Sequence, residues 1–312
     1  MQGRKQGRKV LVTLLIGLIL AGWNQRAELV EWWEGLWPAA PTLVQTDIQP
    51  QTQRYAEPGQ IAVGTFNIRM FSNNSRDDRE LALIADRLQP FDLVALQEVR
   101  DTVVVGRTVK LLGQRGQAFQ SMISPPVGNR HKERYAFLWR GDQVTVLEQG
   151  TLYLDVDDVF LREPYFARFQ AGSFDFALVT LHAIYGQHIR QRRAEAQHLD
   201  RVFQAVQTRY PDEGDILFLG DFNLPPNDPA LAGLAQQLTP LFTGPVRTTI
   251  SDRSLYDHIW IDPLQVLEFT GRTGMDRFDE YAFANDDKAA SLAVSDHRPV
   301  WAAFKTEGPD DD

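Results

Sequence analysis

The 312-residue chain contains no cysteine. This absence excludes a disulfide framework, a thiol nucleophile and a zinc site built from thiolates. Any catalytic chemistry in this protein must therefore use oxygen and nitrogen groups, which carboxylate, amide, hydroxyl and imidazole side chains supply.

Positive charge is also scarce. The chain has 32 Lys and Arg residues against 41 Asp and Glu residues, which gives a formal net charge of -9. Proteins that bind nucleic acids usually carry a basic field, so the total charge by itself argues against such a partner. A site for a polyanion would have to be local, or it would need the help of a cation.

The chain has no long hydrophobic run at its N-terminus. The apolar stretch at residues 10–22 is shorter than the about 20 residues that a membrane-spanning helix needs. It follows several basic residues within positions 4–9, and this order is typical of an export signal. No small-residue cleavage site follows, because Trp23 comes next. We therefore expect residues 1–27 to be a signal peptide or an uncleaved membrane anchor, with the catalytic domain outside the cytoplasm.

A short segment separates this leader from the body of the chain. Its first part, ELVEWWEGLW at residues 28–37, has apolar residues at helical spacing. The pattern fits an interfacial membrane helix, a short helix that packs on the domain or a poorly ordered stalk, and its Glu-rich polar face argues against the membrane helix. A Pro-, Gln- and Thr-rich linker completes the segment at residue 59. One catalytic domain is expected over residues 60–306, followed by an acidic tail at 307–312.

From residue 61 onward, short apolar runs alternate with turn residues. Seven runs have the length and the β-branched or aromatic enrichment of strands. They are IAVGTFNI, FDLVALQE, RYAFLWR, DFALVTLH, DILFLGDFN, YDHIWID and PVWAAF. Many strands with few helices predict a mixed α/β or α+β domain with packed sheets.

Two stretches between these runs have the periodicity of helices. The first is expected to begin with Ser75 as its N-cap and to bury the apolar face that runs from Leu81 to Leu88. The second is expected over about residues 188–209 and ends before Pro211.

Polar side chains follow most of the predicted strands. Each has an ordinary explanation when it is taken alone: a turn or cap residue for Asn67, a structural histidine for His182, an Asx-turn for the GDFN motif. Glu98 directly follows a buried run, so its carboxylate must be solvated, paired or bound to a metal. Functional groups tend to lie where the strands of a rigid scaffold emerge into loops. The strand-end residues are Asn67, Glu98, His182, Asp221, Asn223, Asp257, Asp296 and His297.

Together these groups match the needs of phosphodiester hydrolysis. The reaction needs a cation on a phosphoryl oxygen, a base that activates water, an acid for the leaving oxygen and donors that spread charge. Glu98 and Asp296 offer hard oxygen ligands for the cation. His182 and His297 titrate near neutral pH and suit the acid and the base. The acid and the amide of GDFN can orient water and phosphate.

Seven motifs between residues 61 and 305 resemble, in the same order, those of the endonuclease/exonuclease/phosphatase superfamily. They are TFNIR, LVALQEVRD, KERYAFLWR, LVTLHA, LFLGDFN, LYDHIWI and LAVSDHRPV. Within the superfamily the sequence is most similar to deoxyribonuclease I. The resemblance implies an α+β fold, a four-layer αββα sandwich in which two packed, mainly antiparallel β-sheets are flanked by helices.

The resemblance also implies roles for the motif residues. Glu133 would orient His182, which protonates the leaving 3′ oxygen, and Asp257 would orient His297, which takes a proton from water; the two roles could be exchanged. Asp221 would act with them, and Asn223 would bind phosphoryl oxygens. The expected cofactor is Mg²⁺, with Mn²⁺ or Ca²⁺ as alternatives. Its implied ligands are Glu98, Asn67 and Asp296.

Four further positions match substrate contacts of deoxyribonuclease I. Arg100 matches an arginine that enters the DNA minor groove, Arg162 matches a phosphate contact, and Thr248 falls near another phosphate contact. His131 replaces a tyrosine that stacks against sugar and base.

These expectations describe a monomeric, divalent-metal-dependent endonuclease that cuts double-stranded DNA and leaves 5′-phosphates, with possible membrane association through its N-terminus. Two alternatives stay open. One is a sphingomyelinase-like phosphodiesterase or phosphatase that acts on lipid or inositol phosphates, against which the KERY and YDHI motifs argue. The other is a catalytically silent binding module that has kept the fold.

Overall fold

The computed structural model describes residues 54–308 with the exception of residue 131. The expected leader, the expected amphipathic helix and most of the expected linker therefore lie outside the described residues, as do His131 and the end of the acidic tail. Among the residues that are described, no helix is long and apolar enough to cross a bilayer.

The first of two β-sheets has six strands in the described part of the chain. They are β1 (Gln60–Phe71), β2 (Leu93–Val99), β3 (Phe119–Ile123), β4 (Arg134–Arg140), β11 (Phe269–Met275) and β12 (Val300–Lys305). Their order across the sheet is β11-β12-β1-β2-β4-β3. The pair β1 and β2 runs parallel, and the other neighbours run antiparallel.

The second sheet, within the same described residues, also has six strands. They are β5 (Thr145–Leu152), β6 (Tyr165–Ala171), β7 (Phe174–His182), β8 (Ile216–Asp221), β9 (Thr239–Pro240) and β10 (Asp257–Ile261). Their order is β5-β6-β7-β8-β10-β9. Only β7 and β8 run parallel among these neighbours, so both sheets are mainly antiparallel.

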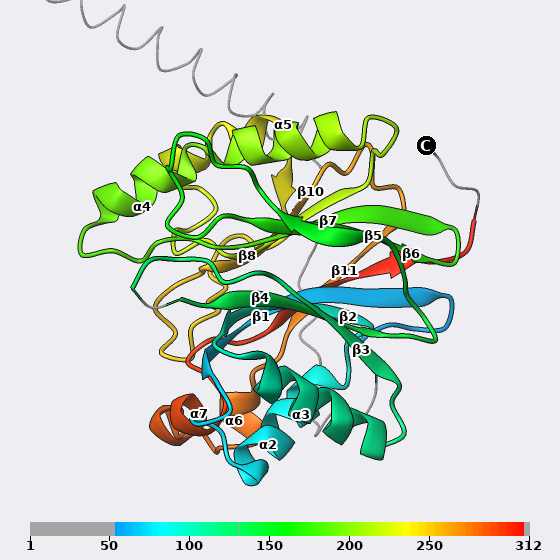
Figure 1. The fold of residues 1–312 in the computed structure, drawn as a ribbon, viewed down its shortest axis with the longest axis vertical. Coiled ribbons are helices and arrows are strands. Elements are labelled where there is room, and N and C mark those ends of the chain that lie inside the picture. Colours follow the sequence, from blue (N-terminus) through cyan, green and yellow to red (C-terminus); the bar gives the residue numbers. More distant parts are fainter. Residues whose placement is uncertain (1–53, 131, 309–312) are drawn as a thin grey trace, which may run out of the picture. The chain divides into compact units, whose positions relative to one another are not determined.

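Helices cover the outer face of each sheet (Figure 1). On the first sheet they are α2 (Asp78–Leu88), α3 (Thr102–Gln114), α6 (Phe278–Tyr281) and α7 (Asp287–Ala293). On the second they are α4 (Ile189–Ala196) and α5 (Leu199–Arg209), followed by the short 3₁₀ turns η1 (Pro229–Leu231) and η2 (Leu234–Gln236). The expected four-layer αββα sandwich is confirmed.

Three hydrophobic cores follow from these layers. The central core lies between the sheets, where Phe137 of β4 meets Phe169 of β6 edge-on at 5.4 Å between ring centroids. Two outer cores join each sheet to its helices. Every residue of β8 and β10 is buried, because both faces of the second sheet are covered. This double coverage explains the uninterrupted apolar runs at residues 216–219 of β8 and 259–261 of β10.

All seven predicted strands are present, and two helix predictions need correction. The N-cap of α2 is Asp77 rather than Ser75, because the Asp77 carboxylate accepts the Glu80 N–H and the Glu80 side chain accepts the Asp77 N–H in return. Ser75 instead bonds the carbonyl of Met70. The helix expected at 188–209 is two helices, α4 and α5.

Strands β7 and β8 approach each other closely at Gly220, the first residue of the GDFN motif. Its φ is +144°, and a Cβ built there would lie 2.2 Å from the carbonyl oxygen of Leu181. Gly220→Ala should therefore lower the free energy of unfolding by about 1–3 kcal/mol, as measured by urea denaturation. The matched control is Gly106→Ala inside α3, where a Cβ meets nothing within 4 Å and should add about 0.5–1 kcal/mol. Equal effects of the two substitutions would contradict the close approach.

Candidate active site

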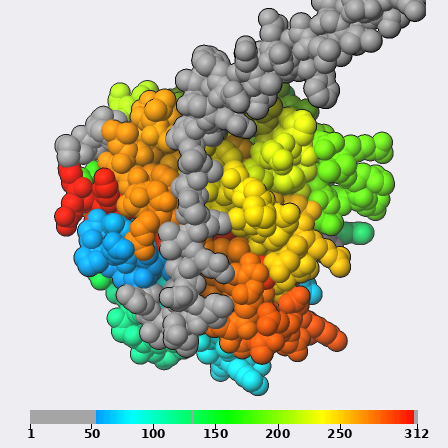
Figure 2. Space-filling model, turned by 180° about the vertical axis from the view of Figure 1, so that it is seen from behind, coloured from blue at the N-terminus to red at the C-terminus, as the bar shows by residue number. Residues whose placement is uncertain are grey.

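The polar strand-end residues meet in one pocket of about 620 Å³. It lies where the carboxyl ends of β2, β7 and β8 face the start of β10. The loop before β10 and helix α7 close another side, and the gold and deep-orange segments in the view from behind show them side by side (Figure 2). Seven residues predicted from the sequence line the pocket, namely Asn67, Glu98, His182, Asp221, Asn223, Asp296 and His297.

His182, the last residue of β7, is held by two residues from the first sheet. Its Nδ1 lies 2.6 Å from Glu133 Oε1, and its backbone N–H donates to the hydroxyl of Tyr135. Glu133 is almost completely buried, with 1% of its surface exposed. Burial lowers the pKa of His182, but the Glu133 carboxylate outweighs it and raises that pKa above the ordinary value. The imidazole thus has a fixed orientation and a stabilised charged form.

His297, just before β12, forms a second pair of the same kind. Its Nδ1 lies 2.8 Å from Asp257 Oδ2, and Asp257 is fully buried at the start of β10. Burial lowers the pKa of His297, but the carboxylates of Asp257 and Asp221 raise it well above its ordinary value. The family resemblance implied both pairs, and the geometry shows both.

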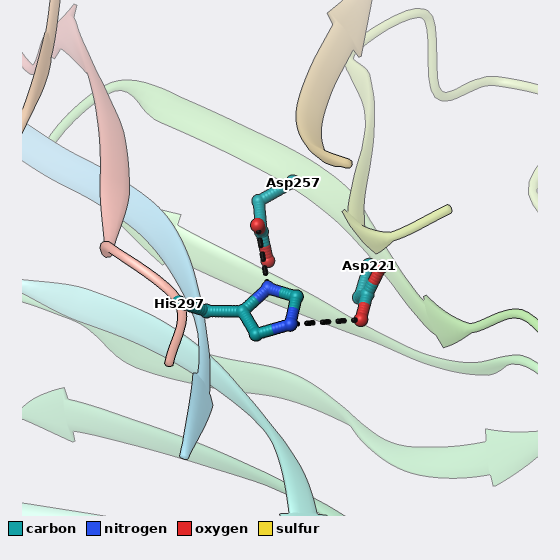
Figure 3. A group of neighbouring side chains, drawn as sticks. All are labelled: Asp221, Asp257 and His297. Carbon is teal, nitrogen blue, oxygen red and sulfur yellow. Dashed lines mark hydrogen bonds and ion pairs between the residues drawn. The ribbon is translucent and has the colours of Figure 1, made fainter. Parts of the chain in front are cut away.

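Asp221 lies between the two imidazoles. Its Oδ2 is 3.6 Å from Nε2 of His182. The same oxygen is 3.8 Å from Nε2 of His297 (Figure 3). The same oxygen accepts a hydrogen bond from the Asn67 side chain at 3.0 Å. Burial raises the pKa of Asp221. The Nε2 atoms of both histidines therefore lie close to the same carboxylate oxygen.

Asn223 completes the GDFN turn. Its backbone N–H donates to Asp221 Oδ1 at 2.9 Å, and its side chain donates to the carbonyl of Ala183. Its φ of 52° places it in the left-handed region, as does the φ of 59° at Glu98. Two non-glycine residues in this region within one pocket show that the surrounding structure holds them in costly conformations, a common property of functional sites.

Glu98 and Asn67 offer a fit for a divalent cation. Asn67 is buried and its Oδ1 has no hydrogen-bond partner among the described residues, while its Nδ2 lies 3.4 Å from Glu98 Oε1. Burial raises the pKa of Glu98, but the neighbouring His182, the N–H of Met70 and Arg100 together lower it, so the carboxylate is ionised. An orphaned amide oxygen beside an ionised carboxylate matches the hard ligands that Mg²⁺ and Ca²⁺ prefer. Asp296 is exposed on the wall of the same pocket.

A second group could also hold a metal. Ligand atoms of Asp221, Asp257 and His297 all lie within 4.8 Å of one another (Figure 3). Asp257 already bonds His297 Nδ1 through its Oδ2 from a fully buried position, and its Oδ1 has no hydrogen-bond partner among the described residues. The acidic cluster is therefore compatible with a metal, and the histidine pair favours the Glu98 side of the pocket.

The two predicted substrate-binding arginines contact carboxylates of the site. The Arg162 Nε lies 2.7 Å from Glu133 Oε1 and its guanidinium donates to the carbonyl of His182. Arg100 lies between Glu98 and Glu133, at 3.6 Å and 3.7 Å. Both arginines thus pair with carboxylates of the site, and a phosphate would have to compete for them.

Thr248 is placed outside the pocket lining. It is fully buried, and its hydroxyl oxygen accepts the N–H groups of Tyr256 and Asp257 at 3.0 Å and 3.1 Å. This geometry makes Thr248 a support for Asp257 rather than a group that reaches the pocket. Its neighbour Thr249 does line the pocket.

Three supporting residues were not predicted from the sequence. The hydroxyl of Ser295 donates to the Asn67 carbonyl at 2.6 Å and accepts the His297 N–H, so it joins β1 to the histidine loop. Glu195 of α4 accepts backbone N–H groups from the loops that follow His182 and precede β6. Arg298, the residue after His297, is buried in an ion pair with Asp279, with 2.7 Å between Nε and Oδ1. Ser295 and Arg298 flank the Asp-His pair in the sequence, and this position was the signal that could have found them.

Comparison with known proteins agrees with this site. The model of the Endonuclease/Exonuclease/phosphatase family matches residues 64–297. The chain is 30% identical over 260 residues to a deoxyribonuclease of Thioalkalivibrio sp. (strain K90mix), which covers 78% of this chain and 71% of that protein. It is 30% identical over 274 residues to deoxyribonuclease-1 of Sus scrofa, which covers 78% of this chain and 92% of that protein.

A solved structure shows the same fold. It is the endonuclease/exonuclease/phosphatase family protein from Bacteroides thetaiotaomicron, with a TM-score of 0.55 at 17% identity, over 80% of this chain and all of that one. The chain therefore belongs to the endonuclease/exonuclease/phosphatase family and is a phosphoesterase of that family. The family resemblance read from the sequence is confirmed.

The raised histidine pKa values predict a change in the pH profile. Asp257→Asn removes the charge that raises the pKa of His297, so the limb of the kcat/KM profile that His297 governs should move to lower pH. If His297 is the base, which works only above its pKa, the acidic limb moves; if it is the acid, the basic limb moves. The activity itself should fall by up to about 10⁴-fold.

Glu133→Gln is the matched variant for this prediction, because it should move the limb that belongs to His182. The measurement is the residual activity on a small phosphodiester across about pH 5–10, which extends about two units below neutral and about three units above it. Profiles that keep their parental limbs in both variants would contradict the pairing.

Proposed function

We propose that this phosphoesterase is a divalent-metal-dependent endonuclease like deoxyribonuclease I, which cuts double-stranded DNA and leaves 5′-phosphates. The observation that carries the proposal is the placement of two carboxylate-backed histidines, whose Nε2 atoms lie 3.6 Å and 3.8 Å from one oxygen of Asp221. The two relatives named as deoxyribonucleases support DNA as the substrate, because the likeness to them extends over most of the chain.

The histidines would move the protons of the reaction. His297 takes a proton from the attacking water while Asp257 stabilises the imidazolium that forms. His182, with Glu133 behind it, donates a proton to the leaving 3′ oxygen. Proton transfer at both oxygens lets the P–O bond to the 3′ oxygen break as the bond to water forms, which leaves the phosphate on the 5′ side.

Asp221 and Asn223 would place the reacting groups. Asp221 accepts hydrogen bonds from buried donors and lies beside both Nε2 atoms, so it can hold the attacking water between them. Asn223 is fixed in its turn by Asp221, and its side-chain nitrogen donates one hydrogen bond to the Ala183 carbonyl. The second N–H of this amide would donate to a phosphoryl oxygen as negative charge develops.

A divalent cation would bind to Glu98 and Asn67, with help from Asp296 on the pocket wall. When bound, it supplies Lewis-acid polarisation of a phosphoryl oxygen and offsets the negative charge of the protein around the substrate. The net charge of -9 then presents no obstacle to a polyanionic substrate.

Loss of either histidine should abolish most of the activity. In His182→Ala and His297→Ala, nicking of supercoiled plasmid should slow by about 10²–10⁴-fold, because a general acid or base is lost. His198→Ala, which lies between α4 and α5, is the matched control and should cut at the parental rate. End-labelling of the products should find phosphate on the 5′ ends. Near-parental nicking by both folded histidine variants would disprove the scheme.

Removal of the metal ligand should change the cation requirement. In Glu98→Gln the Mg²⁺ concentration for half-maximal cutting should rise by at least about 10-fold, and chelation should stop cutting by the parental protein. Glu57→Gln, an exposed position outside the pocket lining, serves as the control. Parallel assays on sphingomyelin and inositol polyphosphate complete the test, since faster turnover of either than of plasmid would favour the lipid or inositol phosphate alternative.

A further inference from the structure

An aromatic side chain with no role in the proposed chemistry lies at the rim of the pocket. Tyr185 belongs to the loop between β7 and α4, three residues after His182, and 59% of it is exposed. It lines the same pocket as both histidines. Single exposed hydrophobic residues are common on protein surfaces, so exposure alone says little about function. The way in which Tyr185 is held is more informative.

Arg192 of α4 fixes the tyrosine ring. Its guanidinium carbon lies 3.7 Å from the centroid of the Tyr185 ring, which is close cation–π stacking. The same guanidinium donates hydrogen bonds to the carbonyls of Tyr185 and Asn223 and to the hydroxyl of Tyr256. Three acceptors on three segments therefore hold one planar cation, and this cation covers one face of the ring.

The rim of the pocket also carries an arginine that takes no part in the contacts around Tyr185. Arg253 is exposed, lines both this pocket and a neighbouring one of about 630 Å³, and has no ion pair or hydrogen bond with the residues that the structure describes. The two pockets share Ser254 and Tyr256 as well. A strand of nucleic acid that leaves the catalytic groups can thus pass the Tyr185 ring and meet an available cation.

We propose that Tyr185, stacked on Arg192, is a platform for an unpaired nucleobase next to the scissile phosphate, and that Arg253 binds a neighbouring phosphate. The proposal rests on the nuclease function proposed above. Nucleobases stack on aromatic rings and on guanidinium planes, and such contacts are a main source of affinity for single strands. A base inside a duplex is already stacked on its neighbours, so the platform serves single-stranded or locally opened nucleic acid.

The contact between Arg192 and Asn223 connects this platform to the chemistry. Arg192 holds the Asn223 carbonyl at 3.1 Å, and Asn223 is the residue proposed to bind the phosphoryl oxygens. A base stacked on Tyr185 would therefore be registered against the phosphate that is cut. We infer that the enzyme accepts single-stranded DNA as a substrate in addition to the duplex.

The test compares cutting of a single-stranded oligonucleotide and the same sequence as a duplex. Tyr185→Ala should lower kcat/KM on the single strand by about 5- to 100-fold, the range measured for loss of one stacked base, and should change duplex cutting much less. Tyr185→Trp keeps a stacking surface and should retain the parental rate. Ile189→Ala on α4, also exposed but outside the pocket lining, is the matched control.

A set of oligonucleotides with one abasic site each, moved along the strand, locates the stacked base. At the position that stacks on Tyr185, loss of the base should slow the parental protein and leave Tyr185→Ala unaffected, because the two changes remove the same contact. At every other position the ratio of the two rates should stay constant.

The outcomes separate this proposal from the nuclease function. Equal loss on single strand and duplex, or a constant ratio at every abasic position, would mean that the ring only stabilises its loop and would overturn the platform. Parental cutting by Tyr185→Ala would do the same while leaving the nuclease intact. A parental protein that cuts no nucleic acid would end both proposals.

Discussion

Each histidine of the pocket bonds to a carboxylate that comes from the opposite β-sheet. His182 ends β7 of the second sheet and its partner Glu133 precedes β4 of the first, whereas His297 precedes β12 of the first sheet and its partner Asp257 opens β10 of the second. The hydrogen bond from Asn67 to Asp221 crosses in the same way. Face-to-face packing of the sheets is therefore the condition for the site, and the large central core is what fixes the catalytic distances.

The polar residues at the strand ends could be predicted from the sequence because the buried strands are covered on both faces. An uninterrupted apolar run marks residues 216–219 of β8 and residues 259–261 of β10, and a polar residue beside such a buried run must be solvated, paired or bound to a ligand. The residues that meet in the pocket were found in this way. Their pairing was not: Glu133 and His182 are 49 residues apart, and only the family resemblance connected them.

The elements that escaped prediction have weaker local signals. The edge strand β5 alternates exposed and half-buried residues without an apolar run. Helix α3 contains three consecutive valines and two glycines, which disfavour a helix in isolation. Packing against the first sheet decides the helix, since Val104, Val105 and Leu112 are buried there. The prediction of Ser75 as the N-cap of α2 was wrong for a related reason. Ser75 and Asp77 are both suitable capping residues, and only the geometry of the chain selects Asp77.

Most arginines around the pocket bind other groups of the protein. Arg162 and Arg100 contact Glu133, and Arg192 is held by three acceptors. The position of an arginine near a nuclease site therefore does not by itself show that the arginine contacts the substrate. The contacts of Arg162 and Arg100 with Glu133 also explain how a chain of net negative charge can form a local site for a polyanion. The arginines offset the negative charge of the site's carboxylates.

The buried pair of Arg298 and Asp279 has a consequence for how this loop can evolve. Arg298 follows His297 directly, and both partners are almost completely enclosed. Replacement of Arg298 alone would leave the Asp279 carboxylate uncompensated in the interior, which is far more costly than the pair itself is worth. Replacement of Asp279 alone would remove the buried partner of Arg298 and leave it with Asp252 and the more distant Glu280. Natural variation at these two positions should therefore be correlated, with both ionic partners kept or both exchanged for apolar residues, even though neither one touches the pocket.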